Sequence, residues 1–386
     1  MKCKLGEIVD VIMGQSPKSE FYNTEEKGYP FLQGNRTFGL KYPTFDIYTT
    51  VLTKLAKAGD IIMSVRAPVG DLNITPVDMC LGRGVCSLRM KNGNQSYLFY
   101  MMKYYIPYLL QKESGTVFGS VSKRDITELE VDIIEDVEKQ KRIVSYLEMI
   151  DDKIELNNAI NKNLEQQAQA IFKAWFVDFE PFNEEMPSDW IIGTVDDLGT
   201  EIICGKTPPT KKKEYYGGNT PFITIPDMHG CVYNVSTERY LSAAGVALQP
   251  KKTLPPNTVC VSCIGTAGLV NLVSEKSQSN QQINSIVPKE GISAYYIYLL
   301  MQTLSETINK LGQSGSTIVN LNKTQFGKIQ VAIPSEQVLC NFDTLCKPLF
   351  EMILSNQKEN IELANLRDAL LPKLISGELD VSDIDL

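Results

Sequence analysis

The sequence has a single histidine, His229, no excess of positive charge and no long apolar run. With one histidine to share, neither a Ser/His/Asp nor a Cys/His catalytic group can be assembled. The formal net charge of −8 argues against a protein that binds nucleic acid tightly by itself, because Lys and Arg supply much of the affinity for phosphates. Nowhere do about 18 apolar residues run together, so no membrane span is expected.

The rest of the composition bounds the class of protein. A chain of 386 residues exceeds what one core usually organises, so two domains are expected. The first residues include Lys2, Lys4 and Glu7, and these charges argue against a secretory signal. Nine scattered cysteines are an odd number and form no disulfide framework, which predicts a cytoplasmic protein. Acids gather at 135–138 and in the tail 377–386, where solvated ends and helix starts are the expected setting.

The two halves of the chain repeat one another. Gly14-Gln15-Ser16-Pro17 corresponds to Gly205-Lys206-Thr207-Pro208, and each half ends in a long helical segment. Matches that keep the same order along the chain predict a duplicated module. The other matching segments are 28–32 with 219–223, 58–64 with 256–262, 69–70 with 267–268, and 115–123 with 315–323.

Each half combines short strands with a short aromatic helix. Segments 60–65 and 258–263 are β-rich and bounded by Gly, Pro or Asn, which predicts strands. Segments 97–102 and 295–301 are apolar almost all round and predict buried core helices rather than base-stacking platforms. The fold class is therefore α+β, with two tandem α/β modules in a pseudo-two-fold repeat.

Two long helices separate and close the modules. Between 138 and 175 there is neither proline nor glycine, and apolar residues alternate at intervals of four and three, as in a coiled coil. Equivalent seams favour packing of the two helices on each other, and chain reversal in the module between them makes the pair antiparallel. Polar residues at seam positions fix register, so Asn157, Asn161, Asn356 and Asn360 are the candidates for setting it. The predicted seam residues are Ile143, Leu147, Ile150, Ile154, Leu164, Ala168, Ile171 and Trp175 in the first helix, and Leu345, Leu349, Met352, Leu363, Leu366 and Leu370 in the second.

Motifs that suggest an enzyme fail on inspection. Segment 199–207 resembles a phosphate-binding loop but has one residue too many between its glycines, and Pro208 obstructs a following helix. Cys260 and Cys263 have the spacing of a zinc knuckle, yet the sequence offers no second pair, so they are interpreted as core cysteines. The adjacent Asp151 and Asp152 are interpreted as a solvated helix face.

A set of motifs occurs in a characteristic order, at 14–17, 205–208, 220–228, 279–283, 315–321, 138–143, 334–337 and 370–379. Together they resemble the specificity subunit of type I restriction-modification systems over essentially the whole chain. The first module departs from the pattern, since Cys80-Leu81-Gly82-Arg83-Gly84 stands where the second has Ser279-Asn280-Gln281-Gln282. This divergence fits two modules that read different sequences.

The resemblance implies a DNA-reading protein that is not itself an enzyme. It implies a bipartite double-stranded DNA target with a fixed nonspecific spacer, and two long helices that dock two methylation subunits and, through them, restriction subunits. S-adenosylmethionine and ATP with Mg²⁺ are expected on those partners, with no cofactor and no metal in this chain. The predicted division is target recognition domain 1 at 1–134, the first spacer helix at 135–180, target recognition domain 2 at 181–333, the second spacer helix at 334–376, and the acidic tail at 377–386.

Candidate DNA-binding residues are the polar and basic side chains of loops between strands. Arg suits guanine, whereas Asn and Gln suit adenine through paired hydrogen bonds. Lys211, Lys212 and Lys213 are expected to contact phosphate rather than bases. The candidates are Gln15, Ser16, Gln33, Asn35, Arg36, Arg66, Arg83, Ser122 and Lys123 in the first module, and Lys206, Thr207, Lys211, Lys212, Asp227, His229, Asn280, Gln281, Ser316 and Lys323 in the second.

Two other classes of function stay open at this point. One is a specificity-like portion of a fused restriction-methylation enzyme, which genomic neighbours would identify. The other is a protein-interaction scaffold with degenerate modules, which DNA binding in the presence of a methylation subunit would distinguish.

Overall fold

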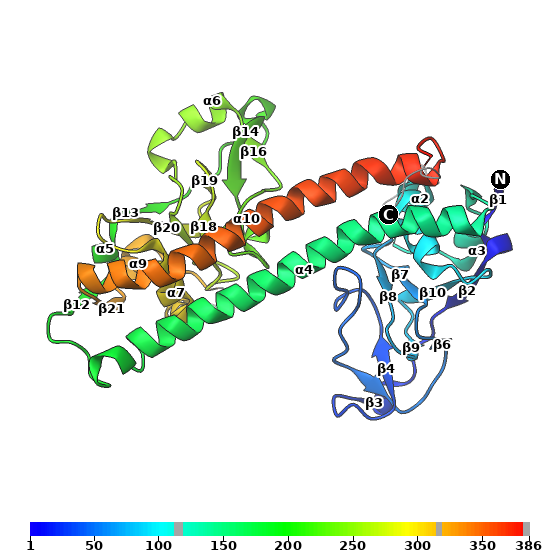
Figure 1. Ribbon diagram of the computed structural model, residues 1–386, viewed down its shortest axis with the longest axis horizontal. Coiled ribbons are helices and arrows are strands. Elements are labelled where there is room, and N and C mark those ends of the chain that lie inside the picture. The colour runs from blue at the N-terminus through cyan, green and yellow to red at the C-terminus, as the bar shows by residue number, and fades with distance from the viewer. Residues whose placement is uncertain (112–118, 314–318, 381–386) are drawn as a thin grey trace. The chain divides into compact units, whose positions relative to one another are not determined.

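A computed structural model describes residues 1–111, 119–313 and 319–380 (Figure 1). By its internal contacts the chain divides into unit 1, Met1–Asp152 with Leu363–Leu386, and unit 2, Lys153–Glu362. The long helices α4 (Val137–Phe176) and α10 (Glu336–Ile375) therefore each contribute to both units. In the predicted division they are separate spacer segments, at 135–180 and 334–376.

Unit 1 is built on two larger sheets, and the aromatic helix α2 lies against strands β7 and β10 of the first of them. The sheet β2-β10-β7-β8 is antiparallel, and the sheet β3-β5-β4-β9-β6 includes the parallel pair β4–β9. Strand β1 pairs with β11 and joins the two ends of the module. The elements are β1 (Lys2–Lys4), α1 (Leu5–Ile8), β2 (Val9–Met13), β3 (Tyr22–Asn23), β4 (Tyr29–Leu32), β5 (Tyr48–Thr49), β6 (Leu55–Ala56), β7 (Ile61–Ser64), β8 (Leu72–Ile74), β9 (Met79–Leu81), β10 (Val85–Met90), α2 (Gln95–Gln111), α3 (Lys123–Thr127) and β11 (Glu130–Asp132).

Unit 2 repeats this topology, which confirms the predicted duplication. Its sheet β13-β20-β17-β18-β15 corresponds to β2-β10-β7-β8 with one added strand, and the parallel pair β14–β19 corresponds to β4–β9. The elements are β12 (Ile191–Thr194), α5 (Val195–Leu198), β13 (Gly199–Cys204), β14 (Tyr216–Ile223), β15 (Tyr233–Asn234), β16 (Tyr240–Leu241), α6 (Ala243–Ala247), β17 (Val259–Ser262), β18 (Val270–Val273), β19 (Gln278–Ser279), β20 (Ile283–Pro288), α7 (Ala294–Thr303), α8 (Ser305–Gly312), α9 (Lys323–Gly327) and β21 (Gln330–Ile333).

The predicted aromatic helices are core elements in both units. Tyr97, Tyr100 and Met101 of α2 are buried, as are Tyr296 and Tyr298 of α7. Burial of large aromatic side chains removes much apolar surface from water and is a main source of stability for such a module.

The two long helices run antiparallel within unit 2. Asn157 donates from Nδ2 to Oδ1 of Asn360 at 2.9 Å, and Asn356 donates from Nδ2 to Oδ1 of Asn161 at 2.9 Å. From Asn157 to Asn161 the residue number rises along α4, while that of the hydrogen-bond partner on α10 falls from 360 to 356. This confirms that the two helices are antiparallel, as predicted. The four asparagines do pair across the helices; their role in fixing register stays a prediction.

The predicted seam of α10 is wrong at three positions. Leu345, Met352 and Leu366 are 47%, 52% and 49% exposed. Within unit 2, α10 instead buries a face that includes Phe342 and Phe350 against the module core. The buried face of α10 therefore packs against the module, and its apolar residues recur with the ordinary helical period of about 3.6 residues. A coiled-coil seam between two helices would require a period of about 3.5 residues. In α4 the predicted residues are buried or half-buried, with Ile143, Leu147, Ile154 and Ala168 the most buried.

Candidate nucleic-acid interface

In unit 1, the turn after β2 lies directly against the loop between β9 and β10. The Gln15 N–H donates to the Leu81 carbonyl at 2.9 Å, and the Gly14 N–H donates to the Val85 carbonyl at 3.0 Å. Ser16 Oγ accepts the Arg83 N–H at 3.1 Å. Candidates 67 residues apart in sequence, Ser16 and Arg83, are thus brought together.

Glycine is required in these loops because their backbones touch. A Cβ atom on Gly14 would lie 2.0 Å from the Gly82 carbonyl oxygen, and one on Gly84 would lie 2.1 Å from the Gln33 carbonyl oxygen. Neither oxygen belongs to a flexible side chain that could move aside. The contact of Gly84 also places Gln33, at the end of β4, beside the same loop.

Two further loops complete this group in unit 1. The Val65 N–H donates to the Gly84 carbonyl and the Val121 N–H donates to the Val65 carbonyl, both at 2.9 Å. Arg66 forms an isolated bridge with Ser120. We define loop cluster 1 as residues 14–17, 33–34, 66, 82–84 and 120–123, whose exposed polar side chains include Gln15, Gln33, Arg66, Arg83 and Lys123.

Unit 2 contains the equivalent arrangement. The Lys206 N–H donates to the Ser279 carbonyl at 2.9 Å, and Thr207 Oγ1 donates to Gln281 Oε1 at 2.6 Å. A Cβ on Gly205 would lie 2.1 Å from the Asn280 carbonyl oxygen. The Cys263 N–H bonds the Gln282 carbonyl, and Ile264 bridges Asn320. We define loop cluster 2 as residues 205–208, 264–265, 280–282 and 320–323, with Lys206, Gln281 and Lys323 exposed.

Several candidates support loops instead of facing outward. Asn280 is only 7% exposed, and its Oδ1 accepts the Gln282 N–H at 3.0 Å, so it shapes the loop that presents Gln281. Asp227 accepts from the Thr224 N–H and the Glu238 N–H, both at 2.8 Å, and ties two segments together. Ser122 caps α3 by accepting the Asp125 N–H.

The remaining candidates lie apart from the clusters or carry intramolecular partners. Asn35 donates to Asp71, and Arg36 pairs with Asp46. Lys211 and Lys212 lie exposed before a short 3-10 helix (Lys213–Tyr215), and His229 is exposed after another (Pro226–Met228). Ser316 lies outside the described residues. Cys260 and Cys263 are buried, and burial raises the pKa of each thiol to about 12, which fits core cysteines.

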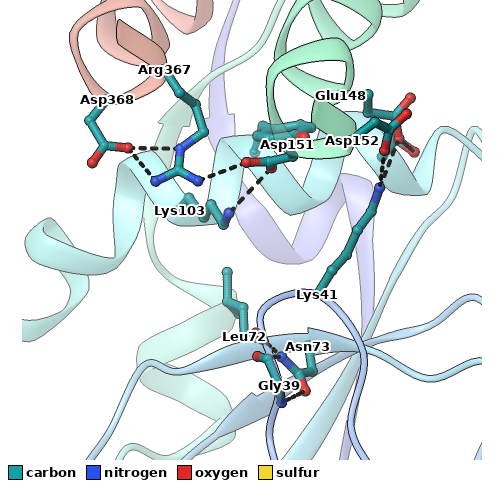
Figure 2. A network of polar contacts seen from close by, with 12 residues as sticks. Gly39, Lys41, Leu72, Asn73, Lys103, Glu148, Asp151, Asp152, Arg367 and Asp368 are labelled. Carbon is teal, nitrogen blue, oxygen red and sulfur yellow. Dashed lines mark hydrogen bonds and ion pairs between the residues drawn. The ribbon is translucent and has the colours of Figure 1, made fainter. Parts of the chain in front are cut away.

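The prediction that Asp151 lies on a solvated face is wrong. Its side chain is 5% exposed and pairs with Arg367 of α10 at 2.7 Å and with Lys103 of α2 at 3.7 Å (Figure 2). Tyr100 donates from its hydroxyl to the same carboxylate at 2.8 Å. One feature of the sequence could have indicated the burial of Asp151: it lies four residues after the buried Leu147, on the same face of the helix.

The electrostatics of this network follow from its burial. Burial acts to raise the pKa of Asp151, but the hydrogen bond from Arg367, the charge of Lys103 and the Tyr100 hydroxyl together hold it below its ordinary value. Burial lowers the pKa of Lys103, against the pull of Asp151. The network therefore joins α2, α4 and α10 by charge, in the part of unit 1 where α4 and α10 meet the module.

The described residues include no helix that is both long and apolar enough to span a membrane. They also hold no group of three or more His, Cys, Asp or Glu placed to bind a metal ion.

Two equivalent α+β modules, each presenting a cluster of polar loops, define a duplicated two-module protein. The family model described as type I restriction modification DNA specificity domain matches residues 1–166 and 187–345. The chain belongs to this family. It is a specificity subunit of the type I restriction-modification class, and its part is DNA sequence recognition rather than catalysis.

Individual relatives and one solved structure agree with this assignment. The chain is 34% identical to the type I restriction enzyme HindI specificity subunit of Haemophilus influenzae, over 84% of this chain and 88% of that protein. It is 27% identical to the MjaIX specificity subunit of Methanocaldococcus jannaschii, over 84% and 79%. The crystal structure of a type I S subunit from M. genitalium has a TM-score of 0.61 at 17% identity, over 99% and 96% of the two chains, and supports the fold.

Proposed function

We propose that loop cluster 1 and loop cluster 2 each read one half of a bipartite double-stranded DNA site, separated by a nonspecific spacer of constant length. The observation that carries the proposal is the pair of equivalent clusters, one in each unit, with different side chains at equivalent positions. Arg83 and Gln281 stand on the corresponding loops after β9 and β19. Two readers with one scaffold and different side chains are suited to two different half-sites.

The chemistry of the exposed side chains suits base and phosphate contacts. Arg66 and Arg83 can each offer paired donors to guanine O6 and N7. Gln15, Gln33 and Gln281 can each offer a donor and an acceptor to adenine. Lys211 and Lys212 suit phosphate oxygens, which give affinity without sequence information.

The partners complete the enzyme in this proposal. Helices α4 and α10 dock two methylation subunits, and restriction subunits bind through them. S-adenosylmethionine and ATP with Mg²⁺ belong to those partners, and this chain carries no cofactor. The net charge of −8 disfavours tight DNA binding by the chain alone. This supports partners that make part of the contacts to the DNA phosphates. All nine cysteines are free thiols, which supports a cytoplasmic setting.

Exchange of one module tests the two-reader proposal. Replacing residues 181–333 with the equivalent segment of another specificity subunit should change one half of the methylated motif and leave the other half intact, because each cluster is built within its own unit. Methylome sequencing of a host that carries the hybrid measures this. A hybrid that alters both halves would refute the proposal.

Dependence on partners is a second expected result. The purified chain should bind its target weakly, and addition of the methylation subunit should create tight binding that weakens steeply as salt rises, because more phosphates are then neutralised. Fluorescence anisotropy with a labelled duplex at several salt concentrations measures both effects. Nanomolar specific binding by the chain alone would contradict the expectation.

A further inference from the structure

A loop in unit 1 runs from loop cluster 1 to helix α4. We call residues 33–46, which follow β4, the strap. The strap begins with the candidate base contacts Gln33, Asn35 and Arg36, and it includes Lys41, whose side chain reaches α4 (Figure 2). It therefore joins a proposed DNA-facing segment to one of the long helices.

The strap is held to the sheet near Lys41. The Gly39 N–H donates to Asn73 Oδ1 at 3.0 Å, and Asn73 Nδ2 donates back to the Gly39 carbonyl at 2.9 Å (Figure 2). The Ile74 N–H donates to the Lys41 carbonyl at 2.8 Å. Asn73 is fully buried on β8, so the backbone around residues 39–41 has a fixed place.

The strap is also closed at its base. The Phe38 N–H donates to the Asn35 carbonyl at 3.0 Å, and the Thr44 N–H donates to the Thr37 carbonyl at 2.9 Å. Arg36 pairs with Asp46 at the other end of the strap. A loop bonded to itself in this way transmits a displacement of one part to the rest.

The side chain of Lys41 fastens the strap to α4. It is 11% exposed, and its Nζ lies 3.9 Å from Glu148 Oε1 and 3.8 Å from Asp152 Oδ1. Glu148 is itself oriented by Ser96 of α2, whose hydroxyl donates to Oε1 at 2.8 Å. Two carboxylates on successive turns of one helix thus face a single, nearly buried ammonium group.

Unit 2 has a different arrangement at the equivalent place. The segment after β14 meets α10 through a neutral hydrogen bond, from the Tyr233 N–H to Gln357 Oε1 at 3.0 Å. Beside it lies a cavity of about 650 Å³ whose lining includes Lys162, Glu165 and Gly230. In the described part of unit 2, no ion pair joins this segment to a long helix.

We propose that Lys41 is a positioning residue for DNA reading by unit 1. Its ion pairs with Glu148 and Asp152 fix the strap, and the strap fixes Asn35 and Arg36 relative to loop cluster 1, to which Gln33 belongs. The inference rests on the proposed function of that cluster. Because Asp152 is 68% exposed and both distances are long, the pairs add little to overall stability, so positioning and stability can be separated by experiment.

The test uses the complex with its methylation subunits and the Lys41→Met variant, which keeps an apolar stem without the charge. Duplexes carry one base substitution in either half-site, and discrimination is the affinity ratio of cognate to substituted duplex. Discrimination at the half-site of unit 1 should fall about tenfold, while that at the half-site of unit 2 stays unchanged. The melting temperature should not move, and Lys41→Arg should retain discrimination.

A matched control removes another lysine ion pair of the same unit. Lys27 pairs with Glu25 on the surface at 2.5 Å, so Lys27→Met should leave both half-sites unaffected. The double variant Glu148→Gln with Asp152→Asn should reproduce the Lys41→Met result. Unchanged discrimination, or equal loss at both half-sites, would overturn the proposal. If exchange of residues 181–333 still changes only one half-site, either of these outcomes overturns the role of Lys41 and leaves the proposed two-reader function standing.

Discussion

Replacing Gly14 with alanine should abolish discrimination at the half-site read by unit 1. The new Cβ would lie 2.0 Å from the Gly82 carbonyl oxygen, and the Val85 carbonyl oxygen would lie 2.7 Å away. Both obstacles are backbone atoms, so the turn and the loop that presents Arg83 must separate. Overpacking of this kind costs about 1–3 kcal/mol or more, and it displaces Gln15, Ser16 and Arg83 together. Binding of the complex to duplexes substituted in one half-site measures the effect.

Two glycines provide the controls for this experiment. Gly205→Ala brings a Cβ to 2.1 Å from the Asn280 carbonyl oxygen and should produce the mirror result, a loss confined to the half-site of unit 2. Gly34 has no atom within 4 Å of its virtual Cβ, so Gly34→Ala should leave both half-sites readable although it adjoins Gln33. Loss at both half-sites in either single variant would show that the clusters do not act separately.

Replacing Asp151 with asparagine should strongly destabilise unit 1. The substitution leaves Arg367 and Lys103 without their buried carboxylate. Removal of one partner from a buried ion pair typically costs about 3–5 kcal/mol, because the remaining charge is uncompensated. Asparagine can keep a hydrogen bond to Tyr100, so the lower end of this range is expected. Urea unfolding followed by circular dichroism measures the loss, and a change under about 0.5 kcal/mol would contradict the role assigned to the network.

The same network predicts a pH dependence with a definite sign. The pKa of Asp151 is lowered in the folded protein, so its contribution is fully present above the ordinary aspartate pKa of about 3.9 and is lost as pH falls through the folded value. The stability difference between the parent protein and Asp151→Asn should therefore be constant near neutral pH and shrink below about pH 4. Asp152→Asn is the matched control, because that neighbour is 68% exposed and should change stability little.

Sequence reasoning succeeded where a pattern is local or repeated. The duplication was visible because equivalent turns such as 14–17 and 205–208 keep their order, and each needs glycine at a backbone contact. The first long helix was expected because residues 138–175 contain neither proline nor glycine, and α4 spans Val137–Phe176. The aromatic helices were assigned to the core because their apolar residues leave no polar face.

It failed where a side chain's role depends on contacts distant in sequence. Met352 and Leu366 were placed in a helix seam by spacing, but which face of α10 is buried depends on where the module core lies. From sequence alone Asp151 was interpreted as a surface charge, because its partners Lys103 of α2 and Arg367 of α10 lie far away along the chain. Asn280 was predicted to be an exposed amide, but it is buried and its Oδ1 accepts a hydrogen bond from the Gln282 N–H within its own loop.

Composition, order of motifs and periodicity are properties of the chain, so they predicted a duplicated, two-module protein with two long helices before any contact was known. Which loops touch, which polar side chains face outward and which charges are buried depends on contacts that form only in the folded chain. Ser16 and Arg83, or Lys41 and Glu148, lie far apart in sequence, and their proximity arises only when strand pairing and helix packing fold the chain back on itself.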